Sequence, residues 1–552
     1  MFYLFHIFRS FIPLLNPIGF GASDFIEFFV AAVLVSLVLV RDHLMRFAHS
    51  LAERTLWSML ALGALTIALR LALLPQAGVP IPSTADDTSY LLLADTLSHF
   101  RLANVTHPLH RFFETNFVLQ EPSYSSIFPL GQGLALELGR AIFGHPWAGV
   151  LLSEATLCAL CYWMLRGWIS AGWALAGGFL AVLQLGPLTY WMNSYWGSAV
   201  SGIGGCLVFG ALGRLAKGVR SRDAILLGVG LGLELLTRPY ECVFLAAIVA
   251  LFLLFHWKRL AMVAPLVIAA TLPFLSLTLA QNRAVTGSWT TLPYMASRDQ
   301  YGVPTSFTFQ PVPVPHRELT PEQRRGYDRQ SEVHDRESAR SLWGRLLDRA
   351  GYIRFFLSPS ILVTLPVFLL ALRDRRLWWP VGTILMLLAG STFYPYFYPH
   401  YIAALACVFL LAAVVALQRM PPMAANAIVC LAVVHFAFWY GLHAYGNQDF
   451  LAALGPYEVF DFVNHGDPEG RLPILSQLEQ TPGDQLVFVR YAPFHPLREW
   501  IANAADIDRS KVVWALDLGA EEDSKLRDYY PDRTVWLAEP DARPPQLLRY
   551  SK

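Results

Sequence analysis

The hydrophobic pattern of this 552-residue chain consists of long apolar stretches separated by short polar loops. About twelve stretches of roughly 16–22 residues have the length of helices that cross a lipid bilayer. They lie near residues 24–41, 56–74, 146–166, 171–190, 196–213, 222–237, 240–257, 259–280, 353–372, 377–393, 401–418 and 424–444. The pattern therefore predicts an all-α polytopic membrane bundle.

Two long polar loops, 75–145 and 281–352, interrupt the apolar stretches, and a polar tail follows them. In the second loop, Thr320 is expected to cap a charged helix that runs to about residue 347, with Pro321 in its first turn. The tail shows the strand patterns 486–491, 511–518 and 534–539 among the helical patterns 457–463, 472–480, 497–504 and 524–530. This alternation predicts a small α/β domain with a three-stranded, mostly parallel sheet.

Three domains are therefore expected. Residues 1–55 form an interfacial segment and the first membrane helix, residues 56–444 form a transmembrane module, and residues 445–552 form a soluble domain. Hydrophobic residues make up 55% of the chain and charged residues only 15%, which agrees with a membrane protein. The net charge of +1 does not favour a nucleic-acid partner.

The distribution of Lys and Arg predicts how the bundle is oriented. One set of short loops carries most of these residues, whereas the opposite set holds only Arg9 and Arg238. The basic set is expected to be cytoplasmic. This orientation requires that segment 127–143, which contains Glu137 and Arg140, is a helix lying on the outer leaflet rather than a span. Both long loops and the tail then lie outside.

Two adjacent acids, Asp86 and Asp87, follow the span near 56–74. The mutual repulsion of two carboxylates costs free energy that water or bound partners must offset, and one of the two is well placed to take a proton from a hydroxyl. Alternatively, both acids are solvated loop residues, or Asp86 caps a helix that starts near Thr88.

Further polar residues cluster at the outer ends of the spans. Arg238 is suited to grip a phosphate with two parallel hydrogen bonds, and His400 and Tyr401 are candidate second contacts. The alternatives are an Arg238–Glu241 pair across one helical turn, and an interfacial His400. The candidate substrate-binding residues are Glu114, Asn193, Tyr195, Trp196, Glu241 and Arg283.

The signals for a metal or nucleotide are weak. His107, His110 and Glu114 have helical spacing, but Pro108 interrupts any helix there. In the tail, His495 and Glu499 lie four residues apart, as a metal or sugar site or as residues near a helix cap. No phosphate-binding glycine motif follows a strand. We therefore expect no cofactor and no bound metal, with a divalent ion as the alternative.

The order of these motifs resembles the C-type glycosyltransferase superfamily, and within it a bacterial family-39-like branch. The resemblance covers roughly residues 56–444. It rests on the stretches DDTSYLLLADT from Asp86, SYSSIFPLGQG from Ser123, WMNSYWGS from Trp191 and VVWALD from Val512. It further rests on Leu-Thr-Arg ending at Arg238 and on the Tyr-Pro-rich turn 398–401.

The resemblance implies an integral-membrane enzyme that uses a polyprenyl-phosphate sugar and has Asp86 as its catalytic base. Relatives have a lysine for the lipid phosphate where this chain has Ile127, and a second proline where it has Leu130. Phosphate binding here is then expected to depend more on Arg238 and His400.

Residues and resemblance together predict an inverting glycosyltransferase. The sugar would move from the lipid donor to a hydroxyl of a glycan, lipid or protein acceptor, at the outer face of a bacterial inner membrane. The expected partners are the donor, the acceptor and membrane lipids, without nucleic acid. The alternatives are a transporter or lipid flippase, and a non-catalytic scaffold derived from such an enzyme.

Overall fold

The structure of the protein is a computed structural model. It describes residues 48–445 and 469–550 apart from residue 497, together with residues 33, 451, 458, 460, 462, 466 and 467. The predicted span 24–41 and most of the tail helix 457–463 therefore lie outside the described residues.

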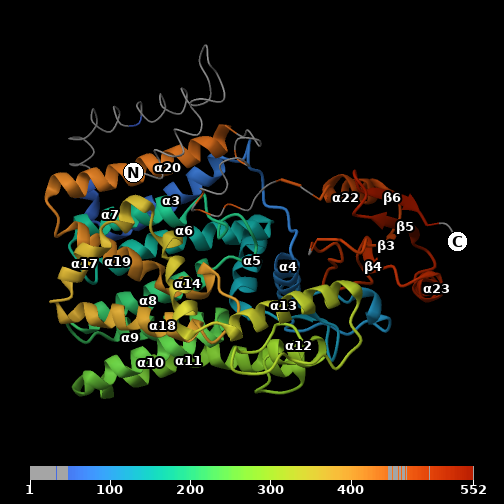
Figure 1. Ribbon diagram of the computed structural model, residues 1–552, viewed down its shortest axis with the longest axis horizontal. Helices are drawn as coiled ribbons and strands as arrows, with labels where there is room; N and C mark the ends of the chain where they lie inside the picture. Colours follow the sequence, from blue (N-terminus) through green and yellow to red (C-terminus); the bar gives the residue numbers. More distant parts are fainter. Residues whose placement is uncertain are drawn as a thin grey trace, which may run out of the picture.

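The described bundle is built mostly from apolar helices that overlap the predicted spans (Figure 1). Its helices are α3 (Thr55–Ala72), α6 (Pro146–Leu165), α7 (Ala171–Leu185), α8 (Ala199–Leu215), α9 (Ser221–Thr237), α10 (Pro239–Phe255), α11 (Trp257–Thr286), α15 (Ile353–Phe356), α16 (Pro359–Leu362), α17 (Leu365–Ala371), η2 (Arg375–Leu377), α18 (Trp378–Ser391), η3 (Pro399–Leu405), α19 (Ala406–Leu417) and α20 (Pro422–Tyr445).

Within the described residues, five helices are long and apolar enough to cross a membrane, or six if one bent pair counts as a span. The predicted number of twelve is not reached by this measure. Several bundle helices, among them α7, α8 and α10, have only 15–17 residues.

The predicted span 353–372 is not one helix. The chain bends by 118° between the helical stretches 342–356 and 359–371. Ser358 precedes Pro359 and has an extended backbone, with φ −58° and ψ 156°. Because a residue before proline disfavours the helical conformation, this dipeptide breaks the segment that its hydrophobicity alone predicts to be continuous.

The long loops carry helices of their own. They are α4 (Ala85–Ser98), η1 (His110–Phe113), α5 (Leu130–Phe143), α12 (Pro293–Tyr301), α13 (Pro321–Ala339) and α14 (Leu342–Gly351), with a short antiparallel pair of strands β1 (Val118–Leu119) and β2 (Ser125–Ser126). Thr320 caps α13 as predicted, in a reciprocal capping box with Gln323. The predicted helix to residue 347 is instead two helices, because Ser341 caps α14.

The C-terminal domain contains a four-stranded sheet in the order β4-β3-β5-β6. The three predicted strands, β3 (Gln485–Val489), β4 (Val512–Leu516) and β5 (Thr534–Glu539), pair in parallel with β3 at the centre. The sequence missed the antiparallel edge strand β6 (Gln546–Arg549). Helices α22 (Arg471–Gln480) and α23 (Ala520–Tyr529) accompany the sheet.

The predicted helix 497–504 is wrong, because the described part of this segment is irregular. Its backbone forms hydrogen bonds with a distant part of the chain, since the Glu499 N–H donates to the Ser83 carbonyl at 3.0 Å. Its side chains Trp500 and Ile501 are buried against the sheet. Tertiary packing thus overrides the local helical pattern.

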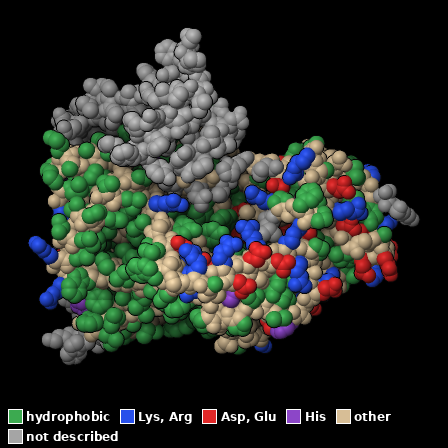
Figure 2. All heavy atoms as spheres, viewed as in Figure 1, with side chains coloured by type: hydrophobic (Ala, Val, Ile, Leu, Met, Phe, Trp, Pro, Cys, Tyr) green, Lys and Arg blue, Asp and Glu red, His purple; other side chains and the backbone are tan. Residues whose placement is uncertain are grey.

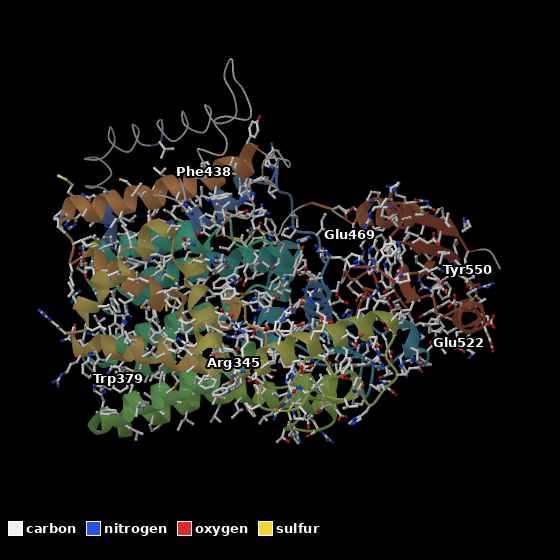
Figure 3. All side chains as sticks on the ribbon, in the orientation of Figure 1. Arg345, Trp379, Phe438, Glu469, Glu522 and Tyr550 are labelled. Atoms are coloured by element: carbon white, nitrogen blue, oxygen red, sulfur yellow. The ribbon has the colours of Figure 1, made fainter. Side chains whose placement is uncertain are left out.

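The first long loop, α12 and α13 of the second long loop, and the C-terminal domain lie at one end of the bundle, whereas α14 lies among the bundle helices (Figure 1). Hydrophobic side chains cover much of the bundle, whereas charged ones cluster over α13 and the C-terminal domain (Figure 2). Figure 3 shows Trp379 toward the opposite end of the bundle from the domain that carries Glu469, Glu522 and Tyr550. Leu92 of α4 shares a hydrophobic cluster with Leu486 and Phe488 of β3, so the domain packs directly on the first loop.

Candidate active site

A cavity of ≈ 840 Å³ lies where the bundle, both long loops and the C-terminal domain meet. Its wall includes six of the predicted catalytic, phosphate-binding and substrate-binding residues, namely Asp86, Trp196, Arg238, Glu241, His400 and Tyr401. The candidate pair of the tail, His495 and Glu499, also lines it. The remaining wall is rich in aromatic side chains, including Tyr90, Phe117, Phe128, Tyr294, Phe307, Tyr394 and Tyr396. A volume in this range holds a small molecule or the head group of a lipid.

The two adjacent acids have different surroundings. Asp86 lies in the first turn of α4 and faces the cavity. Burial raises the pKa of its carboxyl group to about 7, and the neighbouring charge of Asp87 adds to this, while Arg238 acts in the opposite sense. A carboxylate with this pKa is half ionised near neutral pH, which suits a general base.

Asp87 does not line the cavity. Its side chain accepts hydrogen bonds from the Tyr195 N–H at 2.9 Å and from Thr84 Oγ1 at 2.9 Å. The alternative that Asp86 caps a helix starting near Thr88 is wrong, because α4 begins at Ala85 and its N-cap is Thr84, which forms a capping box with Asp87. This geometry makes Asp87 a support for Asp86 rather than a second group in the cavity.

Arg238 connects α9 to α10 and has few partners. Among the described residues, its guanidinium donates a hydrogen bond to Ser198 Oγ at 3.3 Å, and its charge interacts with the Glu241 carboxylate without a direct ion pair. Its Cζ lies 5.1 Å from the centre of the Tyr401 ring. The guanidinium therefore keeps donors for an anion in the cavity.

Aromatic rings enclose His400. The hydroxyl of Tyr190 lies 2.9 Å from its Nδ1. The rings of Trp196, Tyr398 and Tyr401 lie 5.1, 5.4 and 4.6 Å from its ring centre. This packing fixes the imidazole in the cavity wall beside Tyr401, which itself lies under Arg238.

Four predicted substrate-binding residues lie outside the cavity wall. Asn193 accepts a hydrogen bond from Arg70 at 2.8 Å, and the Tyr195 hydroxyl donates to the Pro80 carbonyl at 3.0 Å. Both therefore support the loop that meets Asp87. Glu114 is buried and pairs with Arg111 at 2.9 Å.

Arg283 is the fourth of these residues. It is exposed near the end of α11 and donates to the Gly287 carbonyl. Its sequence neighbourhood is polar, but the long helix α11 carries it away from the cavity wall.

Ile127, which stands where relatives have a lysine, is fully buried. It packs in a hydrophobic cluster with Tyr90, Leu119 and Leu130, whereas its neighbour Phe128 faces the cavity. The isoleucine thus suits its apolar surroundings.

The sequence missed four arginines of the cavity wall, namely Arg298, Arg325, Arg329 and Arg498. They come from α12, α13 and the C-terminal domain. Arg325 donates to the Ala492 and Pro493 carbonyls at 3.2 and 2.8 Å and thereby ties α13 to that domain. Single arginines in polar loops carry no local signal, and only the tertiary fold brings these together.

The candidate metal residues have other partners. His107 lies 3.1 Å from the Tyr530 hydroxyl and 3.3 Å from Asp508. His495 lies 2.8 Å from Asp541, while Glu499 accepts a hydrogen bond from Ile501 N–H. No group of three or more His, Cys, Asp or Glu side chains in the described part of the chain is arranged to hold a metal ion.

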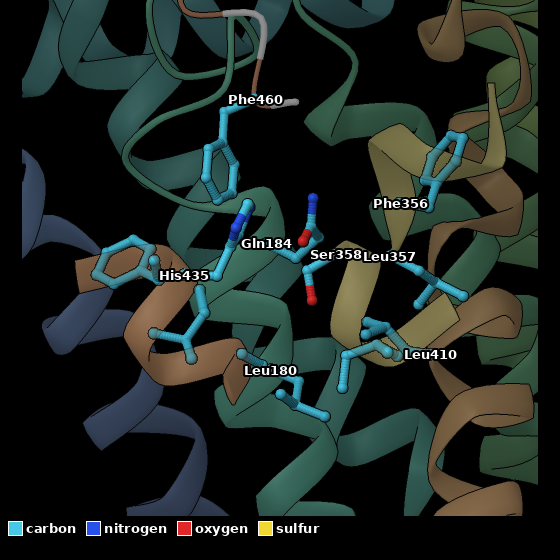
Figure 4. Close-up of a pocket in the computed structure, with 12 residues that line it drawn as sticks. Leu180, Gln184, Phe356, Leu357, Ser358, Leu410, His435 and Phe460 are labelled. Atoms are coloured by element: carbon cyan, nitrogen blue, oxygen red, sulfur yellow. The ribbon is translucent and has the colours of Figure 1, made fainter. Parts of the chain in front are cut away.

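A second, much smaller cavity of ≈ 10 Å³ lies inside the bundle (Figure 4). Gln184, Ser358 and His435 contribute its polar groups, and the remaining lining is mostly apolar. The Nε2 atom of His435 has no hydrogen-bond partner among the described residues. This space is sufficient for about one water molecule, so it is not a substrate site.

No family model matches this chain, and neither does any curated protein sequence. Among solved structures, ArnT from Cupriavidus metallidurans in the apo state matches with 13% identity and a TM-score of 0.48, over 86% of this chain and 92% of that one. The same enzyme bound to undecaprenyl phosphate matches with a TM-score of 0.47, at the same identity and coverage.

The oligosaccharyltransferase of Archaeoglobus fulgidus in the apo form matches with 13% identity and a TM-score of 0.42, over 79% of this chain and 62% of its own length. Because the identities are near 13% and the TM-scores lie below 0.5, what this protein does is inferred below from its own residues.

Proposed function

We propose that this protein is an inverting glycosyltransferase that moves a sugar from a polyprenyl-phosphate donor to an acceptor hydroxyl. One observation carries the proposal: a single cavity combines Asp86, a carboxyl group whose pKa is raised by burial, with Arg238, whose guanidinium retains unused donors. The first group suits a base and the second suits the phosphate of a lipid-linked sugar.

The proposed reaction uses these two groups on opposite sides of the sugar. Asp86 takes the proton of the acceptor hydroxyl as its oxygen forms a bond to the anomeric carbon. The bond from that carbon to the phosphate oxygen breaks, and the polyprenyl phosphate leaves with the electron pair. Arg238 stabilises the negative charge of the leaving phosphate. Attack from the side opposite the phosphate inverts the configuration.

The cavity wall suits the remaining parts of such a donor. Aromatic faces such as Tyr294, Tyr394 and Tyr401 can pack on the apolar face of a sugar ring. Val243 of α10 and Met295 of α12 contribute to the wall and are themselves exposed, which suits an isoprenoid chain arriving from the membrane. With the orientation inferred from the basic loops, the reaction takes place at the outer face of a bacterial inner membrane.

The proposal is tested with the purified full chain in lipid nanodiscs. A panel of synthetic undecaprenyl-phosphate hexoses and pentoses is supplied with bacterial envelope lipids and glycans as acceptors, and release of undecaprenyl phosphate is measured. We expect one donor to react with wild type, and Asp86→Asn to lower its turnover by about 100-fold or more. Equal turnover by wild type and Asp86→Asn contradicts the proposal.

A further inference from the structure

The C-terminal domain contacts both ends of α4, the helix that carries Asp86. At the first end, the Glu499 N–H donates to the Ser83 carbonyl at 3.0 Å. Near the other end, the Ala505 N–H donates to Asp95 Oδ2 at 2.7 Å. The irregular segment 498–505 is therefore bonded both before the first turn of α4 and near its last turn.

Ser83 is the residue through which the C-terminal domain is hydrogen-bonded to the start of this helix. Its hydroxyl oxygen accepts a hydrogen bond from Arg498 at 2.8 Å, and its N–H donates to Asp87 Oδ2 at 3.4 Å. The next residue, Thr84, is the N-cap of α4. The first turn is thus held on one side by its own capping box and on the other by the C-terminal domain.

The segment that holds Ser83 is itself anchored. The buried Glu499 side chain accepts hydrogen bonds from Tyr491 Oη at 3.2 Å and from Ile501 N–H at 2.9 Å. It also accepts one from the Thr115 hydroxyl of the first long loop. Because these partners fix Glu499, its neighbour Arg498 meets Ser83 from a fixed position.

We propose that Arg498 is a positioning residue, which holds Ser83 and thereby keeps the first turn of α4 and the Asp86 carboxylate in place within the cavity. The inference rests on the proposed function and makes the C-terminal domain part of the catalytic assembly. Arg498 acts through Ser83 and not on the sugar, although it also lies in the cavity wall.

Loss of the hydrogen bond between Arg498 and Ser83 has two measurable consequences. The amides of the first turn exchange their hydrogens faster, because local opening of the turn becomes more frequent. Water then reaches Asp86 more often, and since burial is the main cause of its raised pKa, that pKa falls from about 7 toward the ordinary range. The acidic limb of the pH–rate profile therefore shifts to lower pH.

The test compares Ser83→Ala, Arg498→Ala, Arg498→Lys and the Ser83/Arg498 double alanine variant. Arg490→Ala is the matched control, because Arg490 is in the same domain and pairs with Asp517 and Glu539, away from α4. Hydrogen exchange of the peptide covering residues 84–92 is followed by mass spectrometry. Turnover of the reactive undecaprenyl-phosphate sugar is measured across pH.

We expect both alanine variants to speed exchange at Asp87 and Thr88 by about fivefold or more. Their kcat should fall roughly tenfold with donor KM within about twofold, since positioning rather than binding is lost. Arg498→Lys should restore part of the loss. The double variant should be no worse than the worse single variant, because both remove one contact. Arg490→Ala should match wild type.

Unchanged exchange in Ser83→Ala and Arg498→Ala overturns the inference, and so do additive effects in the double variant. Failure of the proposed function has a different signature. In that case wild type and Asp86→Asn turn over the donor equally, whereas the exchange data still report whether the domain holds α4.

Discussion

Replacing Arg238 by alanine should weaken donor binding more than any other single change in the cavity. The guanidinium has one hydrogen bond of 3.3 Å among the described residues, so little of its bonding capacity is committed before the donor arrives. Two charge-assisted hydrogen bonds to a phosphate contribute about 1.5–3 kcal/mol each, less the cost of desolvation. A net loss of about 3 kcal/mol corresponds to a roughly 150-fold rise in Kd.

The binding assay uses a fluorescent undecaprenyl phosphate and the full chain in nanodiscs. Arg283→Ala is the matched control, because it removes the same side chain from an exposed position outside the cavity wall. Arg238→Lys keeps the charge but loses the planar fork, and we expect a loss of about tenfold. The affinity of Arg238→Ala should also depend less on salt than that of wild type.

The same variant has a second expected effect, on pH dependence. The positive charge of Arg238 lowers the pKa of Asp86, so its removal should move the acidic limb of the pH–rate profile above about pH 7. The reasoning is refuted if Arg238→Ala binds the lipid phosphate within about threefold of wild type, or if Arg283→Ala weakens binding equally.

Two further predictions concern residues whose roles the structure clarifies. Asp87→Asn should lower the free energy of unfolding by about 1–3 kcal/mol, because it leaves the Tyr195 N–H and the capping box poorly paired. The measurement is the Tm, which Asp86→Asn should not lower. A destabilised Asp86→Asn variant beside an unaffected Asp87→Asn variant would reverse these roles. Ile127→Lys should destabilise the protein and fail to rescue donor binding in Arg238→Ala, because it places an unpaired ammonium in a closed apolar cluster; a measured rescue would show that the side chain reaches the phosphate.

Local signals predicted much of the fold. Apolar length located the helices of the bundle, and Thr320 with Pro321 located the start of α13. Alternating apolar residues located three strands of the C-terminal sheet. Each of these features depends on a few neighbouring residues, which is why a single sequence reveals them.

Features that depend on distant partners were missed. The edge strand β6 has only four residues, three of them exposed or polar, and is recognisable only beside β5. The helical pattern at 497–504 is overridden by tertiary contacts, because the Glu499 N–H donates to the Ser83 carbonyl and the next residue after the segment, Ala505, donates to Asp95. The bend at Ser358 had a local signal in the following proline, which hydrophobicity outweighed.

The residues of the candidate site also fall into those that the local sequence predicts and those that only the tertiary fold reveals. Asp86 was predicted because it is one of two adjacent acids. Arg238 and His400 were predicted because charged or titratable residues at the ends of apolar spans often mark a functional site. Asp87, Asn193 and Tyr195 belong to the same motifs, but their side chains face inward and support the site. Arg325 and Arg498 lie in ordinary polar segments, and only folding places them in the wall.

The central claim is that Asp86 is the base of a sugar transfer, and the pH dependence of kcat/KM tests it most directly. With the reactive undecaprenyl-phosphate sugar and the wild-type chain, kcat/KM should rise tenfold per pH unit below about pH 7 and level off above it, because the ionised Asp86 is the active form. Asp86→Asn should lower the plateau by about 100-fold or more and abolish this limb. The account would be contradicted if Asp86→Asn kept the wild-type plateau of kcat/KM and the same fall in kcat/KM at acidic pH.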